Sequence, residues 1–282
     1  MTAPLAPPLS SDLALAIRLA REAGAAIEAV RAVGFSAQDK ADTSPVTEAD
    51  LAADRLIRDG LTAARPDDAL LSEESTGAPP RPDQALWCVD PLDGTEAFVD
   101  GGADGAPYVR GYAVQIARFV PHGPHYRLQL GVTYEPRADE LFFAEHGHGA
   151  YRMTGGVVSG PLVMKANLGP PILITSKRVE QDKKARFIAE GYRDGGALRS
   201  VGVKVGRLVL GDADVYLATH QLSWWDLAAP QMILEEAGGR VADLSGDAPP
   251  YRFADLSRPT FRGPFVMARP EALGPALTLL RA

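Results

Sequence analysis

The first strong pattern in the chain is a helical repeat of apolar and small side chains between positions 11 and 33. Such residues recur every three to four positions, at Leu13, Ile17, Ala20, Gly24 and Ile27. This spacing places them on one face, so we predict a helix there with Ser11 as its N-cap. A second helix is expected to begin after Thr47, as N-cap, and to end at Arg65-Pro66.

From residue 69 onward the pattern changes to short apolar runs, some followed closely by acidic residues. Such runs are typical of buried strands, and we predict strands at 69–71, 86–89, 111–118, 127–134, 140–144, 172–175 and 214–218. Further helices are expected at 180–192, 203–211 and 226–237. The mixture predicts an α/β (α+β) fold with two subdomains, 1–155 and 156–282, divided at Gly155-Gly156. The glycine-rich segment from Gly101 to Pro107 is a plain turn or a mobile flap.

Composition and charge narrow the class of protein. The 282 residues are 46% hydrophobic and 23% charged, with a formal net charge of −7. Basic residues are scattered, which argues against a nucleic acid polymer as partner. No apolar run reaches the roughly 18 residues of a membrane span and the chain starts without signal-peptide features, so we expect no membrane contact and a cytoplasmic location. The single cysteine, Cys88, lies in an apolar run and is interpreted as core.

The most informative motif is Asp90-Pro91-Leu92-Asp93-Gly94-Thr95, directly after a predicted buried strand. Two aspartates three apart on a proline-stiffened turn can point at one spot, where they would repel each other without a cation. Magnesium and calcium take oxygen ligands, so these carboxylates and the Leu92 carbonyl suit such an ion. Gly94 and Thr95 then begin a helix whose free N–H groups suit a phosphate. An ordinary turn is the alternative.

Other polar segments are ambiguous when each is considered alone. Ser72-Glu73-Glu74-Ser75 follows a short apolar strand and can supply a further carboxylate or form a solvated acidic turn. Asp226 follows two tryptophans and precedes a predicted helix, where aspartate is commonly an N-cap. His146 and His148 are interpreted as a surface turn rather than a metal site.

Taken together, these segments resemble the inositol monophosphatase family in order and approximate spacing. The resemblance is carried by Lys40 to Asp50, Ser72 to Ser75, Asp90 to Thr95, and Trp225-Asp226 with Ala237-Gly238-Gly239. It implies the layered αβαβα fold of that superfamily and magnesium-dependent hydrolysis of a small phosphate monoester. Lithium sensitivity is also implied, and a homodimer is left open.

The resemblance further assigns roles to single residues. It implies one Mg²⁺ on Glu73, Asp90 and the Leu92 carbonyl, and a second on Asp90, Asp93 and Asp226. A third, loosely held ion is typical. Asp50 and Thr95 would orient the attacking water, with Glu74 as an acidic support, and Gly94 and Thr95 would bind phosphate. The implied reaction is in-line attack by metal-activated water with no phosphoenzyme.

The ester is less well defined by the sequence. Lys40 to Thr47 and Ser200 to Gly206 look closer to bacterial 3′(2′),5′-bisphosphate nucleotidases, which implies 3′-phosphoadenosine 5′-phosphate as substrate and Lys204 and Ser176 as its contacts. From chemistry alone, Lys204 is equally well a surface lysine. Departures from the nucleotidase pattern, such as Glu96, keep an inositol monophosphatase and a sugar or histidinol phosphate phosphatase as alternatives. A noncatalytic metabolite-binding homologue is the alternative from another class.

Overall fold

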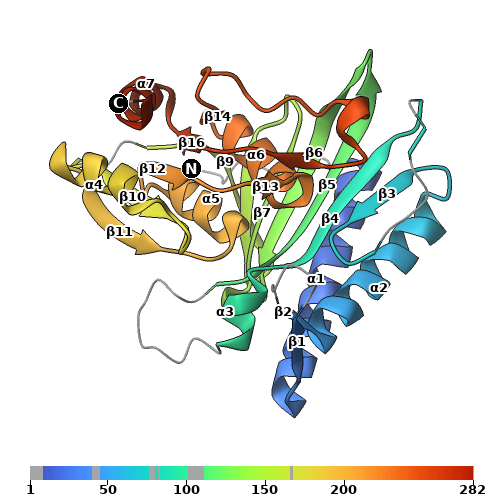
Figure 1. The fold of residues 1–282 in the computed structure, drawn as a ribbon. Helices are drawn as coiled ribbons and strands as arrows, with labels where there is room; N and C mark the ends of the chain where they lie inside the picture. The colour runs from blue at the N-terminus through green and yellow to red at the C-terminus, as the bar shows by residue number, and fades with distance from the viewer. Residues whose placement is uncertain are drawn as a thin grey trace, which may run out of the picture.

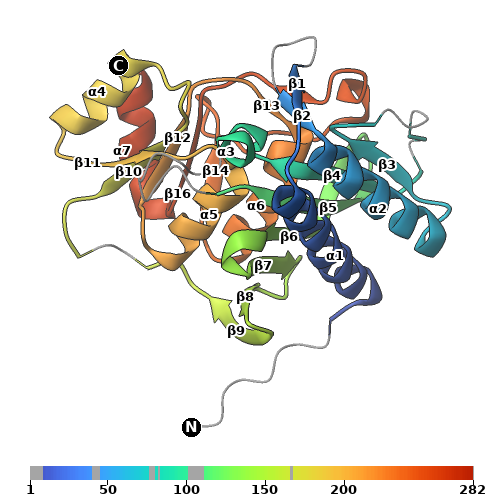
Figure 2. The same cartoon turned by 90° about the horizontal axis from the view of Figure 1, so that it is seen from below.

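The computed structural model describes residues 9–39, 45–75, 80–81, 83–100, 111–165 and 168–281. Five layers follow one another: a helix pair, a seven-stranded sheet, a second helix pair, a five-stranded sheet and a third helix pair (Figure 1, Figure 2). The predicted αβαβα fold is therefore confirmed. The predicted loop at 101–107 and positions 40–44 of the family motif lie outside the described residues.

The first layer consists of α1 (Ser11–Val33) and α2 (Glu48–Ala64), which lie side by side on one face of the large sheet (Figure 1). Both predicted helices are confirmed, and Thr47 caps α2 as expected. The predicted cap of α1 is wrong by one residue, because Ser10 is the extended residue whose Oγ accepts a hydrogen bond from the Leu13 N–H at 3.1 Å. Two short antiparallel strands, β1 (Ala37–Asp39) and β2 (Pro45–Thr47), lie between the helices in the sequence.

The large sheet has the strand order β3-β4-β5-β6-β7-β8-β9, with β3 and β4 parallel and the other neighbours antiparallel. Its strands are β3 (Ala69–Ser72), β4 (Leu86–Asp93), β5 (Ala113–His122), β6 (His125–Glu135), β7 (Glu140–Glu145), β8 (Ala150–Thr154) and β9 (Val157–Leu162). The first five were predicted. The last two were not predicted. In β9, exposed and half-buried positions alternate and there is no continuous apolar run.

The middle layer, α5 (Val201–Leu210) and α6 (Trp224–Glu236), lies between the two sheets (Figure 1). One apolar cluster joins Phe142 of the large sheet to Leu208 of α5 and Tyr216 of the small sheet. α6 is buried on nearly all sides from Leu227 to Leu234, as expected for a helix packed between two layers. Both helices begin two residues before the predicted positions. A short helix, α3 (Thr95–Val99), follows β4 directly.

The small sheet has the order β11-β10-β12-β16-β14, and α4 and α7 cover its outer face (Figure 2). The elements are β10 (Ile172–Thr175), α4 (Gln181–Ala189), β11 (Arg193–Ala197), β12 (Val215–Ala218), β14 (Arg240–Ala242), β16 (Phe265–Ala268) and α7 (Pro270–Arg281). β10, α4 and β12 were predicted. The two-stranded pair of β13 (Leu222–Ser223) and β15 (Thr260–Phe261) and the short 3-10 turns η1 (Pro136–Ala138) and η2 (Phe253–Asp255) complete the described elements.

The predicted subdomain boundary at 155/156 falls in the turn between β8 and β9, inside the large sheet, and the two-subdomain division remains a prediction. Among the helices of the described ranges, none combines the length and apolar character needed to cross a membrane. Hydrogen bonds connect the end of β4 with the first turn of α5, and α3 with the first turn of α2. The candidate site lies at this junction.

Candidate active site

Three carboxylates meet at the junction. Asp90 and Asp93 lie on the last part of β4 and Asp226 in the first turn of α6, and one oxygen from each lies within 4.8 Å of the other two. Asp90 and Asp93 are buried and Asp226 is half-buried. The structure therefore brings together the local pair that the motif predicted and the distant aspartate that the resemblance added.

A bulge explains how two residues three apart on a strand act together. In a regular strand, positions i and i+3 point to opposite faces. Here the register with β5 shifts between Asp90, opposite Gln115, and Asp93, opposite Ala113. Four residues of β4 thus face three of β5, and the extra residue brings both carboxylates to one side. The predicted proline-stiffened turn is wrong in this respect, because the motif up to Asp93 belongs to β4.

Without a bound cation, the carboxylates of the cluster repel one another when they are ionised. Burial raises the pKa of Asp90 well above its usual range, and Glu73, Asp93 and Asp226 raise it further. The pKa of Asp226 rises to about 8 through burial, Asp93 and Glu73. Burial raises the pKa of Asp93 to about 6, although hydrogen bonds from the Ser200 hydroxyl and the Gly202 N–H and the charge of Lys204 oppose the rise. Crowded carboxylate oxygens of this kind fit a hard divalent cation.

Glu73 and Glu74 follow β3 on the adjacent loop. Glu73 lines the same cavity as Thr95, and its N–H donates to the Val89 carbonyl at 3.1 Å. Its charge raises the pKa of all three clustered aspartates, which places it near them, although the tight cluster within the described residues consists of the aspartates alone. The Glu74 N–H approaches the Ser72 hydroxyl at 3.4 Å.

Asp50 and Thr95 form a hydrogen-bonded pair beside the cluster. The Thr95 hydroxyl lies 2.9 Å from Asp50 Oδ1 and 3.1 Å from the Leu92 carbonyl, so its single hydrogen can point to either oxygen. The second Asp50 oxygen accepts from the N–H and the hydroxyl of Thr47 at 2.8 and 2.6 Å. Burial raises the pKa of Asp50, and these donors oppose the rise.

Asp50 and Asp226 occupy equivalent places in their helices. Each is the third helical residue in a capping box, with Thr47 or Ser223 as the N-cap, and Asp226 Oδ2 accepts from the Ser223 N–H at 2.6 Å. The alternative interpretation of Asp226 as an N-cap is thus wrong by three positions, because Ser223 is the N-cap. The spacing of Ser or Thr followed three residues later by an acidic residue is a signal in the sequence that could have located both.

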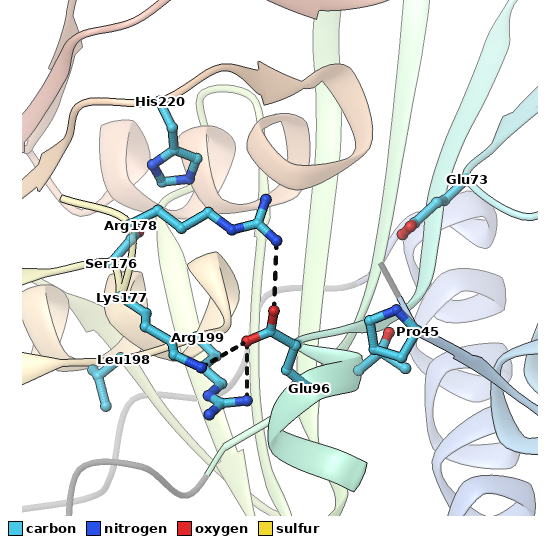
Figure 3. Close-up of a pocket in the computed structure, with 11 residues that line it drawn as sticks. Pro45, Glu73, Glu96, Ser176, Lys177, Arg178, Leu198, Arg199 and His220 are labelled. Carbon is cyan, nitrogen blue, oxygen red and sulfur yellow. Dashed lines mark ion pairs between the residues drawn. The ribbon is translucent and has the colours of Figure 1, made fainter. Parts of the chain in front are cut away.

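A cavity of about 180 Å³ opens beside the cluster, and Glu73, Gly94, Thr95 and Ser176 line it (Figure 3). A separate ionic group lies on its wall. Glu96 forms ion pairs with Arg199 at 3.0 Å, Arg178 at 3.5 Å and Lys177 at 3.7 Å. Figure 3 shows these three cations directed at the Glu96 carboxylate. Of these four residues, only Glu96 was singled out from the sequence, as a departure from the nucleotidase pattern.

Lys204 lies deeper than predicted. It is 1% exposed, and its ammonium donates to the Ser176 hydroxyl at 3.0 Å, the Arg199 carbonyl at 3.1 Å and the Tyr216 hydroxyl at 3.5 Å. The alternative of a surface lysine is therefore wrong. Burial lowers the pKa of Lys204 to about 8, against the effect of Asp93 and Asp226. Ser176 lies on the cavity wall, and a direct contact between Lys204 and substrate remains a prediction.

His220 also lines the cavity and was missed in the sequence. Burial, together with the charges of Lys204 and Arg178, lowers its pKa to about 4, so the imidazole is neutral at pH 7. Nothing in the sequence near His220 distinguishes it from a surface histidine, because its place in the site depends on Arg178 and Lys204 from other elements.

A layered α/β fold with clustered carboxylates where strand and helix ends meet defines a class of phosphatases. The chain belongs to the inositol monophosphatase family, whose model matches residues 9–274. This relationship makes it a phosphatase.

Similar proteins differ in their reported substrates. A histidinol-phosphatase of Chlorobaculum parvum is 34% identical over 241 residues, which cover 84% of this chain and 88% of the relative. The 3′(2′),5′-bisphosphate nucleotidase CysQ of Escherichia coli O157:H7 is 32% identical over 237 residues, covering 81% and 89%. A solved structure of an IMPase/NADP phosphatase with Mg²⁺ and phosphate has a TM-score of 0.77 at 20% identity, and the match covers 95% of this chain and 94% of that one.

Proposed function

We propose that this phosphatase is a Mg²⁺-dependent phosphomonoesterase, with Glu73, Asp90, Asp93, Asp226 and the Leu92 carbonyl as its metal ligands. The observation that carries the proposal is the cluster of Asp90, Asp93 and Asp226, whose oxygens lie within 4.8 Å of one another. Their raised pKa values reflect repulsion that a bound cation would relieve. The related fold solved with Mg²⁺ and phosphate supports the choice of ion.

The residues of the chain have distinct tasks in this proposal. Bound magnesium lowers the pKa of water and neutralises charge on the ester. Thr95 donates its hydrogen to Asp50 Oδ1, and its oxygen can then accept a hydrogen from the attacking water and orient it. Because burial raises its pKa, Asp50 is a better proton acceptor than an exposed aspartate. Gly94 and Thr95, at the start of α3, face the cavity where the phosphate would bind.

We further propose 3′-phosphoadenosine 5′-phosphate, the substrate of a bisphosphate nucleotidase, as the ester. The supporting observation is the cavity wall, where Lys177, Arg178 and Arg199 pair with Glu96. Arg199 also pairs with a second carboxylate, Asp100, at 2.5 Å. Three cations beside two carboxylates leave one positive charge in excess, which suits a second phosphate. Arg178 and Lys177 are the better candidates for this contact, because their side chains are 69% and 64% exposed and that of Arg199 only 14%.

Histidinol phosphate is the second candidate, and a different feature favours it. Glu96 places a negative charge on the cavity wall, which could pair with the ammonium group of that substrate. The histidinol-phosphatase relative is also 34% identical to this chain. The two candidates make opposite demands on the same ionic group, because one needs its cations and the other its carboxylate.

A direct assay separates the candidates. Phosphate release is measured from 3′-phosphoadenosine 5′-phosphate, histidinol phosphate, inositol 1-phosphate and fructose 1,6-bisphosphate, each with Mg²⁺ and with chelator. We expect the highest kcat/KM for the bisphosphate nucleotide. A higher value for histidinol phosphate would select the second candidate, and inactivity on every ester would favour a noncatalytic role.

Replacing one cavity cation tests the proposed contact with the second phosphate. Arg178→Ala should raise KM about tenfold for 3′-phosphoadenosine 5′-phosphate, because a charge-assisted hydrogen bond contributes about 1.5–3 kcal/mol. Adenosine 3′-phosphate, which lacks the second phosphate, should be affected less than about twofold. Arg186→Ala on the surface of α4 is the matched control. Equal effects on both nucleotides would remove Arg178 from this role.

A further inference from the structure

Asp54 lies one turn after Asp50 on α2. Unlike the helix residues Asp50 and Asp226, it has no part in the proposed chemistry. It is 5% exposed. Its Oδ1 accepts hydrogen bonds from the Ser72 hydroxyl at 2.6 Å and from the Ser75 hydroxyl at 3.2 Å. Its Oδ2 pairs with Arg58 at 3.2 Å. An acid that only formed an i,i+4 pair on a helix surface would lie in solvent, whereas this one is directed at the loop after β3.

The loop that Asp54 holds is the one that carries Glu73 and Glu74. Ser72 and Ser75 flank these two residues, and both donate to the same carboxylate oxygen. The Ser72 hydroxyl oxygen also receives the Glu74 N–H at 3.4 Å. On the other side, the Glu73 N–H donates to the Val89 carbonyl of β4 at 3.1 Å. The loop is therefore fastened to α2 and to β4.

The constraint opposes an electrostatic force. The charge of Glu73 raises the pKa of Asp90, Asp93 and Asp226, so the four carboxylates repel one another. A loop free to move would carry Glu73 away from the cluster before a cation arrived. Asp54 can hold it there because Asp54 is itself buried and paired with Arg58.

We infer that Asp54 is a positioning residue that acts through Ser72 and Ser75 to hold Glu73 beside the aspartate cluster, and so sets the affinity for the divalent cation. The inference rests on the proposed function, in which Glu73 is a metal ligand. Partners that orient metal ligands typically change metal affinity by about 10–100-fold when they are removed.

Calorimetric titration of the purified chain with Mg²⁺ tests the inference without any substrate. Asp54→Ala should raise the dissociation constant at least about tenfold. The matched control is Asp59→Ala, because Asp59 is an acid of the same helix, is 70% exposed and pairs only loosely with Arg58 at 3.8 Å. The control should stay within about twofold of wild type. A wild-type dissociation constant in Asp54→Ala would overturn the inference.

Two milder variants separate positioning from folding. Ser72→Ala removes one donor and leaves the Asp54–Arg58 pair intact, and it should weaken Mg²⁺ binding in the same direction. Asp54→Asn retains an oxygen that can accept from Ser72 and should bind Mg²⁺ more tightly than Asp54→Ala does. A purely structural role predicts lower unfolding temperatures in chelator with unchanged Mg²⁺ affinity in both Asp54→Ala and Ser72→Ala. If wild type binds no Mg²⁺, the proposed function fails. If wild type binds Mg²⁺ and the variants bind it with the same affinity, this inference alone fails.

Discussion

Each carboxylate of the cluster has one oxygen engaged by a donor of the chain itself. Asp93 Oδ2 accepts from the Ser200 hydroxyl at 2.6 Å and the Gly202 N–H at 3.0 Å. Asp90 Oδ1 accepts from the Leu92 N–H at 3.0 Å, and Asp226 Oδ2 from the Ser223 N–H at 2.6 Å. These hydrogen bonds thus orient the acids before a cation binds, which lowers the ordering cost of binding.

Neutralising one of these acids should lower kcat without lowering the stability of the protein. Asp93→Asn is expected to lower kcat by about 10²–10³-fold, or about 3–4 kcal/mol, as for the loss of a strong electrostatic group. Its unfolding temperature in chelator should stay the same or rise, because one repelling charge is removed. Steady-state kinetics and thermal unfolding measure both effects, with Asp182→Asn on exposed α4 as control. A near-normal kcat would remove Asp93 from the site.

At the scale of elements, the position of α6 decides where Asp226 lies. Gly131 of β6 faces this helix so closely that an added Cβ would lie 2.7 Å from the Ala229 carbonyl oxygen and 2.9 Å from its Cα. Backbone atoms cannot move aside as a flexible side chain can. The close approach of β6 and α6 therefore requires glycine at this position.

Gly131→Ala should push α6 away from the sheet and affect stability and metal binding together. Overpacking of this kind costs about 1–3 kcal/mol, and Mg²⁺ affinity should fall because Asp226 moves with the helix. Gly274→Ala is the control, since Gly274 lies in α7 with nothing within 4 Å of its added Cβ, and should be neutral or stabilising. Unfolding temperature and calorimetric Mg²⁺ titration provide the comparison. Wild-type values in Gly131→Ala would contradict the proposed packing.

The sequence predicted those elements and site residues whose signal is local. Asp90 and Asp93 stand in one motif, and the helices and main strands around it have clear apolar periods. Lys204 was undetermined, because its burial depends on Ser176, which follows β10, and on Tyr216 of β12. Asp54 was missed for the same reason, since Ser72 and Ser75 approach it only in the folded chain.

For the whole molecule, the acidic cluster predicts how stability depends on pH. In the folded chain the pKa of Asp93 is about 6 and that of Asp226 about 8, above the ordinary aspartate value of 3.8. Between the ordinary and the raised values the folded state binds protons that the unfolded chain does not. Stability without metal therefore falls as pH rises through 6 to 8.

Thermal unfolding in chelator should therefore give a lower midpoint at pH 8.5 than at pH 6. Saturating Mg²⁺ should stabilise the protein more at the higher pH, because the carboxylates must lose their protons to bind it. In the Asp226→Asn variant, the unfolding midpoint in chelator should change less between pH 7 and 8.5 than it does in wild type. A wild-type midpoint in chelator that rises with pH would contradict the raised pKa values.

The most direct test of the proposed Mg²⁺-dependent hydrolysis is a magnesium titration of the chelator-treated protein with 3′-phosphoadenosine 5′-phosphate as substrate. The rate of phosphate release and the binding of Mg²⁺ are followed on the same preparation. We expect almost no release without a divalent cation and a rate that rises with Mg²⁺ occupancy of the cluster. Full activity in the presence of chelator would contradict this expectation.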